Sequence, residues 1–356
     1  MTTFRKKIGV IGRTCLLIYL VALILLPLVL KWVGEKNVAT ALLLYAPPSL
    51  WFIPLPFLLW SAFHFGRLWM AGTMFAGVAA SLMLSGWQFH KTSTSEGAVL
   101  RVMTCNRGQQ GSQSQQGFKN STRPDILVLQ EAAGRSRGLA KSPENAEFTH
   151  SASVGEHTIL SRFPVLGSSI LPAGAAPRQA RAVRFVVNWF GRKISVYSVH
   201  LRTPRDALRA QWPGALVYGV LGLPGTVWGE RRKQYQAFWD GQIADAKMIL
   251  EAAREDPLPV ILAGDFNAPH SGHIRHLLAR ELSDAHEEAG NGCGFTFPGV
   301  TRNPLSLGGP WLRIDYIFFN HEWSALQCVT ERDRPSQHRA VMARLVLRDD
   351  PPSVTE

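Results

Sequence analysis

A carboxylate and a carboxamide stand two residues apart where the segment Val260–Pro269 turns from apolar to polar. The first four residues of this segment have the continuous apolar character of a short strand that is covered on both faces. Because side chains alternate along a strand, Asp265 and Asn267 point to one side and Phe266 points into the packing. Such a pair can position a water molecule and contact a phosphoryl oxygen, although Asp and Asn are also ordinary turn residues.

Other apolar runs also end or begin in a polar side chain. These side chains are Asn106, Glu131, His200, Asp315 and His338. Each is weak evidence by itself, but carboxylates, amides and imidazoles are the groups that hold cations and move protons. Their recurrence at strand ends favours a functional site over a plain turn at Asp265.

The charge of the chain favours anionic partners. The 356 residues carry a formal net charge of +12. Eight of the 38 Lys and Arg and two of the 26 Asp and Glu lie in residues 1–96, which leaves a net charge of +6 for the remainder. This mild excess suits nucleic acid, phospholipid surfaces or phosphorylated metabolites, but it lacks the dense basic blocks of a dedicated nucleic-acid binder. Four cysteines make no disulfide framework, although Cys293 and Cys328 could pair if they meet.

Three apolar segments, at about residues 14–32, 38–63 and 68–87, predict a membrane region over residues 1–90. The second segment contains four prolines, which predict a kinked or broken helix. The third is rich in small residues that suit close helix contact. A signal peptide would also begin with basic residues and an apolar core, but two further apolar segments follow the first. We expect a polar tether over 91–97, a globular domain over 98–348 and a disordered tail over 349–356.

The positive charges predict the orientation in the membrane. The N-terminal tail holds Arg5, Lys6, Lys7 and Arg13, and Arg67 follows the second apolar segment. With these residues inside, three spans place the globular domain on the non-cytoplasmic side.

Two further segments allow alternative interpretations. Residues 212–228 carry no charge and contain four glycines, which fits a loop covering the core or an apolar flap that touches lipid or closes the site. His270, His273 and His276 lie at three-residue spacing, which drifts around a helix and therefore favours surface histidines over a metal cluster.

The order of the strand-end motifs resembles the endonuclease/exonuclease/phosphatase superfamily, which has the deoxyribonuclease-I-like fold. The matching motifs run from about residue 98 to 347 and are Thr104-x-Asn106, Gln130-Glu131, Ile159–Pro164, Ser198–Leu201, Gly264–Asn267, Arg313–Ile317 and Ser336-x-His338-Arg339. The apolar N-terminal segments resemble a group of membrane-anchored bacterial members. The resemblance implies an α/β (α+β) four-layered sandwich, in which two mixed β-sheets are flanked by helices, preceded by about three transmembrane helices in the bacterial inner membrane.

The resemblance also implies a divalent cation at Glu131 and Asn106. Mg²⁺ (or Mn²⁺) prefers carboxylate and carbonyl oxygens together with water, and it neutralises phosphate charge. The superfamily usually has an Asp directly before the last His of the motif, whereas this chain has Gln337. Gln keeps an acceptor oxygen and loses the charge, which bears on metal affinity and on the number of metal ions.

The remaining motif residues take catalytic roles by the same resemblance. Asp265 would orient or deprotonate the attacking water, and Asn267 would contact the phosphoryl group. His200 and His338 would donate hydrogen bonds to the non-bridging oxygens in the transition state. Asp315 would hold His338 in one tautomer and favour its protonated form.

These features predict a membrane-anchored, metal-dependent phosphoester hydrolase of the nuclease phosphodiesterase type. Arg162 and Arg202, with Gln337, are candidate contacts for phosphate or substrate. One alternative is a phospholipid or sphingolipid phosphodiesterase or lipid phosphatase, which the membrane region and the segment 212–228 favour. Another is a non-catalytic binding protein of the same fold. The expected partners are a phosphoester substrate, either nucleic acid or a lipid head group, and the bilayer, with no obligate protein partner.

Overall fold

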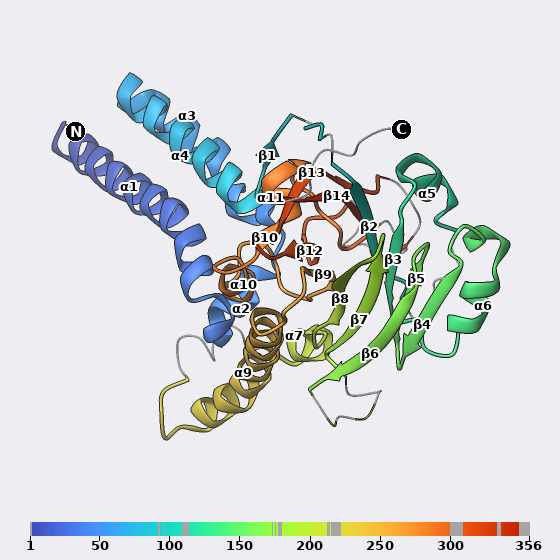
Figure 1. Cartoon of the computed structure of the whole chain (residues 1–356). Coiled ribbons are helices and arrows are strands. Elements are labelled where there is room, and N and C mark those ends of the chain that lie inside the picture. The colour runs from blue at the N-terminus through green and yellow to red at the C-terminus, as the bar shows by residue number, and fades with distance from the viewer. Residues whose placement is uncertain are drawn as a thin grey trace.

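A sandwich of two six-stranded sheets carries a helical arm in the computed structural model (Figure 1). The structure describes residues 2–91, 93–95, 97–108, 114–172, 174, 176, 180–211, 214, 222–299, 309–332 and 336–348, and of residues 2–8 only the backbone. The predicted tail and residues 212, 213 and 215–221 of the apolar segment 212–228 therefore lie outside the described residues.

Both large sheets are mixed, as the family resemblance implies. The first has the order β10 (Ser283–Asp284), β12 (Asp315–Phe319), β9 (Val260–Asp265), β8 (Arg192–His200), β7 (Ala182–Trp189) and β6 (Val165–Leu171). The second has the order β13 (Trp323–Thr330), β14 (Val341–Leu347), β2 (Val99–Asn106), β3 (Ile126–Gln130), β5 (His157–Ser161) and β4 (His150–Val154). The pairs β8–β9 and β2–β3 are parallel and the other pairs are antiparallel.

The apolar runs are buried on both faces, which explains their lack of alternation. In β9, Ile261 and Ala263 join the core between the sheets, whereas Val260 and Leu262 join a second core beneath the helices. The helices over this outer face are α9 (Val227–Arg254) and α10 (His273–Leu278). Helices α5 (Gln116–Thr122) and α6 (Ser136–Lys141) cover the opposite sheet. The four predicted layers are thereby confirmed. The shorter elements are η3 (Pro143–Asn145), α7 (Arg205–Gln211), α11 (Ala285–Ala289) and a two-stranded sheet of β1 (Gln88–Phe89) and β11 (Asn291–Gly292).

The arm consists of N-terminal apolar helices, of which α1, α3 and α4 run away from the sandwich (Figure 1). Its elements are α1 (Thr2–Trp32), η1 (Gly34–Lys36), α2 (Val38–Leu44), η2 (Pro48–Phe52), α3 (Leu55–Phe65) and α4 (Arg67–Ser85). Among the described residues, two helical segments, Gly9–Trp32 and Arg67–Ser85, are long and apolar enough to cross a membrane, in agreement with the first and third predicted spans. The number is three if the bent helix pair Val38–Leu44 and Pro48–Phe65 counts as one span.

The second predicted span, residues 38–63, is broken. Helices Val38–Leu44 and Pro48–Phe65 meet at a bend of 95°. Consecutive prolines at 47 and 48 account for the break, because a proline removes a helical hydrogen bond and moves the preceding residue out of the helical region. Helix α2 packs against α9 of the sandwich through Val38, Ala41 and Leu42.

The structure also tests the expectations for the cysteine pair and for the histidines of residues 270–276. All four cysteines lie within the described ranges and none forms a disulfide bond, so Cys293 and Cys328 do not pair. The histidines of the 270–276 segment lie at the junction with the arm, where His273 is buried and His276 stacks edge-on against Trp32 with ring centroids 4.7 Å apart. They are therefore packing residues of the junction, and the interpretation as surface histidines is wrong for His273.

Candidate active site

Strand register brings the predicted polar residues to one rim of the sandwich. His200 pairs with Asp265 across the parallel strands β8 and β9, and Asp315 pairs with Asp265 across β12 and β9. In the other sheet, Asn106 ends β2 beside the end of β3, directly before Glu131. The Asn106 side chain joins the two sheets, because its Nδ2 donates to Glu131 Oε1 at 3.1 Å and to Asp265 Oδ2 at 2.9 Å.

Asp265 lies at the centre of this rim and is almost fully buried. The preceding Gly264 allows β8 and β9 to approach closely, since a Cβ there would lie 2.0 Å from the carbonyl oxygen of Val199. Asp265 Oδ1 accepts a hydrogen bond from the Asn267 backbone amide at 2.8 Å. Burial raises the pKa of Asp265, against the opposing effects of the nearby histidines and Asn106. A buried carboxylate with a raised pKa is suited to accept a proton.

His338 is held by Asp315 as predicted. Its Nδ1 lies 3.0 Å and 3.2 Å from the two oxygens of Asp315, and its Nε2 lies 3.7 Å from Asp265 Oδ2. Burial opposes the charged ring, but the charges of Asp315 and Asp265 and the hydrogen bond to Asp315 outweigh it and raise the pKa of His338 to about 9. A protonated ring therefore presents an N–H toward the centre at neutral pH.

A second acid–histidine pair involves a residue that the sequence analysis missed. His200 Nδ1 lies 2.7 Å from Glu156 Oε1, and His200 Nε2 lies 3.8 Å from Asp265 Oδ2 and 3.9 Å from Glu131 Oε1. Burial opposes protonation of His200, but Glu156, Asp265 and Glu131 together raise its pKa. Glu156 stands in the turn between β4 and β5 rather than at the end of an apolar run, so the strand-end pattern could not mark it.

A buried polar network supports the rim from within the sandwich. Gln130 Nε2 donates to Ser198 Oγ at 3.2 Å, and His157 Nδ1 lies 2.9 Å from the same hydroxyl. Burial lowers the pKa of His157 to about 4, so this ring is neutral. The network joins β3 and β5 of one sheet to β8 of the other, directly beneath Glu131 and His200.

The residues present fit a hard divalent cation at Glu131. This carboxylate is partly exposed at the rim, and its backbone has a φ of +53°, which turns it out of the strand. Asn106 orients Glu131 through its Nδ2, whereas its Oδ1 accepts from the Gly108 amide at 2.9 Å. As placed, Asn106 therefore positions the ligand, and the expected ligation by its own oxygen is not seen.

A buried group of Asp265, Asp315 and His338 also places candidate ligand atoms within 4.8 Å of one another. A protonated imidazole cannot ligate, because neither nitrogen retains a lone pair in the ring plane. The raised pKa of His338 and its hydrogen bond to Asp315 therefore favour a proton-donating pair over a cation site within this group.

Two predicted contact residues have other partners or lie at the edge of the rim. Asn267 Nδ2 donates to the Leu201 carbonyl at 3.0 Å, which ties the loop after β9 to the loop after β8. Gln337 is exposed beside Gly108, where a Cβ on the glycine would lie 3.8 Å from Gln337 Oε1. Its carboxamide is therefore at the mouth of the site rather than inside it.

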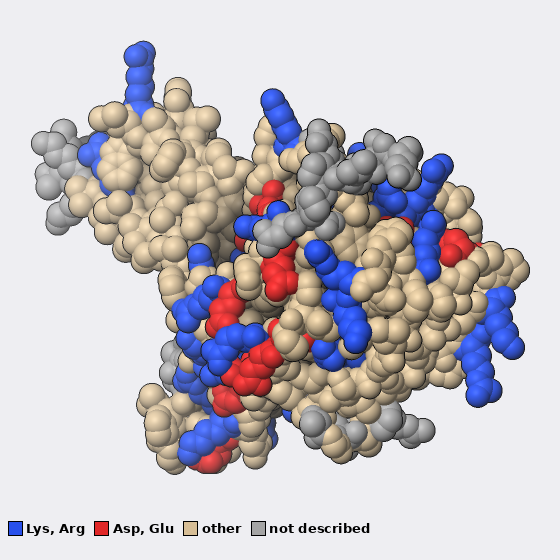
Figure 2. Space-filling model, in the orientation of Figure 1, with Lys and Arg blue, Asp and Glu red and all other residues tan. Residues whose placement is uncertain are grey.

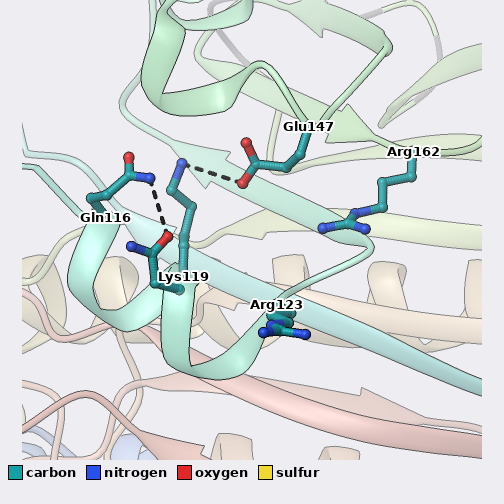
Figure 3. Close-up of a pocket in the computed structure, with 6 residues that line it drawn as sticks. Gln116, Lys119, Arg123, Glu147 and Arg162 are labelled. Atoms are coloured by element: carbon teal, nitrogen blue, oxygen red, sulfur yellow. Dashed lines mark hydrogen bonds and ion pairs between the residues drawn. The ribbon is translucent and has the colours of Figure 1, made fainter.

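The two arginines predicted as phosphate or substrate contacts do not lie beside Asp265 and the two histidines. Arg202 forms a two-point contact with Asp245 of α9, with Nε–Oδ2 and Nη2–Oδ1 distances of 2.6 Å and 3.3 Å. Arg162 lies at the opposite rim, where it lines a pocket with Lys119 and Arg123 (Figure 3). Because β5 runs antiparallel to β3, its last residues emerge one strand length, roughly 16 Å, from the end of β3.

Comparisons with known proteins identify the family of the chain and proteins of similar fold. The model of the endonuclease/exonuclease/phosphatase family matches residues 115–338, more than half of the chain. A Bacteroides vulgatus structure described as an endonuclease/exonuclease/phosphatase superposes with a TM-score of 0.50 at 15% identity, covering 70% of this chain and 100% of that one. A similarly described structure from Beutenbergia cavernae gives 0.48 at 19% identity over 72% and 73%. Humanized D. rerio TDP2 gives 0.48 at 15% identity over 70% and 99%. No curated protein matches the chain.

Proposed function

The chain belongs to the endonuclease/exonuclease/phosphatase family, and from this premise we propose that it is a membrane-anchored, divalent-metal-dependent phosphodiesterase. The family supports phosphoester hydrolysis in general. One observation carries the finer proposal: two acid–histidine pairs direct their Nε2 atoms toward the same buried carboxylate, Asp265. This arrangement sets two imidazole rings, both with raised pKa values, opposite one proton acceptor, which suits attack of water on a phosphate anion.

In this proposal Asp265 accepts a proton from the water whose oxygen forms the new bond to phosphorus. His338 and His200 donate hydrogen bonds to non-bridging oxygens, where negative charge develops as the bond to the ester leaving group breaks. Asp315 and Glu156 favour the protonated form of the two rings and fix their orientation through hydrogen bonds to Nδ1. Glu131, oriented by Asn106, would hold Mg²⁺ or Mn²⁺, which when bound neutralises charge on the phosphate.

The exposed apolar surface of the arm supports membrane anchoring. Phe57, Trp60 and Phe75 are 73%, 69% and 74% exposed. Figure 2 shows the arm as almost entirely tan, in contrast to the charged side chains over the sandwich. Burial of such a surface in lipid removes the unfavourable free energy of exposing apolar side chains to water. The charge distribution of the N-terminal segments supports placement of the sandwich on the non-cytoplasmic side.

Nucleic acid is the first proposed substrate, because the part of the chain after residue 96 retains a net charge of +6. A phospholipid head group is the second. It is favoured by Leu223, which precedes α9, and by Val227 and Trp228 at its start, apolar side chains that are 62%, 74% and 43% exposed. A surface of this kind suits contact with a bilayer.

A substrate panel on the detergent-solubilised full chain separates these proposals. Double-stranded DNA, RNA, phospholipid vesicles and bis(p-nitrophenyl) phosphate are each incubated with Mg²⁺, with Asp265→Asn as the blank. Cleavage of DNA or RNA that weakens steeply with salt supports the first substrate, and release of head groups from vesicles supports the second. Absence of Mg²⁺-dependent cleavage across the panel would contradict the proposed hydrolysis.

A further inference from the structure

The helical arm reaches directly into the catalytic loop. Tyr45, which follows α2, donates its hydroxyl to the backbone carbonyl of Asn267 at 2.7 Å, across a sequence separation of 222 residues. Gln242 of α9 donates its Nε2 to the same carbonyl at 3.1 Å. One carbonyl of the loop is therefore fixed by two donors, one from the sandwich and one from the arm.

The position of the Asn267 backbone bears directly on the orientation of the Asp265 carboxylate. Asn267 has a φ of +46°, in the left-handed region, which reverses the chain direction after β9 and which asparagine adopts more readily than most residues other than glycine. Its amide donates to Asp265 Oδ1, and the other Asp265 oxygen accepts from Asn106 and faces the two histidines. A hydrogen-bonded path thus runs from Tyr45 through the backbone of Asn267 to the central carboxylate.

Tyr45 is itself firmly placed against the sandwich. Its ring centroid lies 5.7 Å from that of Trp239, a fully buried side chain of α9. On the other side of α2, the Glu35 carboxylate accepts hydrogen bonds from the His273 and Ile274 amides at 2.7 Å and 3.3 Å, which docks η1 on α10. The segment carrying Tyr45 is consequently anchored at both ends before it meets the loop.

We propose that Tyr45 is a positioning residue, through which the membrane region sets the geometry of the Asp265–Asn267 turn. This inference rests on the proposed hydrolysis for its kinetic consequence. The arm then does more than hold the enzyme at a membrane: it contributes to the catalytic rim, and Asp265 is correctly aimed only when the arm is docked.

The test is Tyr45→Phe in the detergent-solubilised full chain, which removes one hydroxyl and keeps the ring packing. Loss of one of two donors to the carbonyl is expected to lower kcat about three- to tenfold with little change in KM. Amide hydrogen exchange over residues 264–269 should become faster. Tyr19→Phe is the matched control, because the Tyr19 hydroxyl donates to the Trp51 carbonyl within the arm, away from the loop; its kcat and its exchange over residues 264–269 should equal those of wild type.

The following results would overturn the proposed role of Tyr45. Wild-type kcat and wild-type exchange over residues 264–269 in Tyr45→Phe would overturn it, even if the melting temperature falls, because only a general structural role would remain. Equal losses in Tyr19→Phe and Tyr45→Phe would also overturn it. If the wild-type chain cleaves no phosphodiester, the proposed function fails by itself, and the exchange comparison between the two variants still decides whether Tyr45 positions the loop.

Discussion

At the rim where β2, β3, β8 and β9 end, Asp265 and the two histidines are largely buried and their polar atoms face one another. At the opposite rim, Arg162 is 41% exposed on its side chain, and the Lys119 amine is occupied by the Glu144 carbonyl and Asn145. Both rims carry charged residues: at the opposite rim Arg162 follows β5 and Lys119 lies in α5. At the first rim, the Nε2 atoms of His200 and His338 face the buried Asp265 carboxylate at 3.8 Å and 3.7 Å, out of water, where electrostatic interactions are strongest. The Lys119 amine of the opposite rim is buried as well, but its hydrogen bonds are already made within the fold. Convergence of donors on one acceptor, rather than charge or burial alone, therefore distinguishes the candidate catalytic rim from the opposite one.

Asp265→Asn should have the largest effect, because it removes the proton acceptor and keeps the size of the side chain. We expect kcat to fall by about 10²- to 10⁴-fold, the range typical of a lost general base. Initial rates on the substrate identified by the panel measure this, with circular dichroism melting to show that the variant is folded. Retention of more than a tenth of the wild-type rate would remove Asp265 from the proposed role.

Asp315→Asn tests the electrostatic part of the catalytic rim. Because Asp315, together with Asp265, raises the pKa of His338 to about 9, the wild-type ring is protonated below that pH and its donor is lost above it. Wild-type kcat should accordingly fall as pH rises through about 9. Without the Asp315 charge the pKa of His338 drops, so the alkaline limb should move to lower pH, and activity at pH 8 should fall more than activity at pH 6.

The pH profile of kcat from 5 to 10 distinguishes this outcome from a general defect. Equal losses at all pH values, with the alkaline limb unchanged, would show that Asp315 does not control His338 protonation.

Arg162→Ala should have the smallest effect. Arg162 lies 4.0 Å from Asp125 and is solvated at the far rim, so loss of its charge costs little in stability or in the geometry of the site. We expect kcat/KM within about twofold of wild type and a change in unfolding free energy within about 0.5 kcal/mol. A tenfold loss in kcat/KM on DNA would instead show that nucleic acid binding extends to this rim, and the contrast between the rims would fail.

Local sequence pattern was sufficient for the strands. Apolar runs buried on both faces predicted them and placed polar residues such as His200 and Asp265 at their ends. The four layers, and the gathering of these residues into one site, were implied by the family resemblance. The assignment of Arg162 to the same rim failed because strand direction is not visible in a run of apolar residues. β5 is antiparallel to β3, so the end of β5 faces away and its beginning, next to Glu156, faces the site.

The contacts between residues far apart in the sequence could not be predicted from local pattern either. Tyr45 ends an apolar helix that the composition assigns to a membrane span, and its hydrogen bond to Asn267 depends on the 95° bend that folds α2 back onto the sandwich. Prolines indicated a break in the helix but not its direction. Tertiary packing against Trp239 determines that direction.

The most direct test of the central claim is metal-dependent hydrolysis by the full chain in detergent at pH 7.5. One sample is assayed on bis(p-nitrophenyl) phosphate with Mg²⁺, again after chelation with EDTA, and again after Mg²⁺ or Mn²⁺ is restored, beside Glu131→Gln. We predict hydrolysis that is lost on chelation, recovered on restoration, and strongly reduced at all metal concentrations in the variant, which keeps the Asn106 contact geometry but loses the ligand charge. Hydrolysis that persists in EDTA, or a Glu131→Gln variant with wild-type rates and metal dependence, would contradict the account.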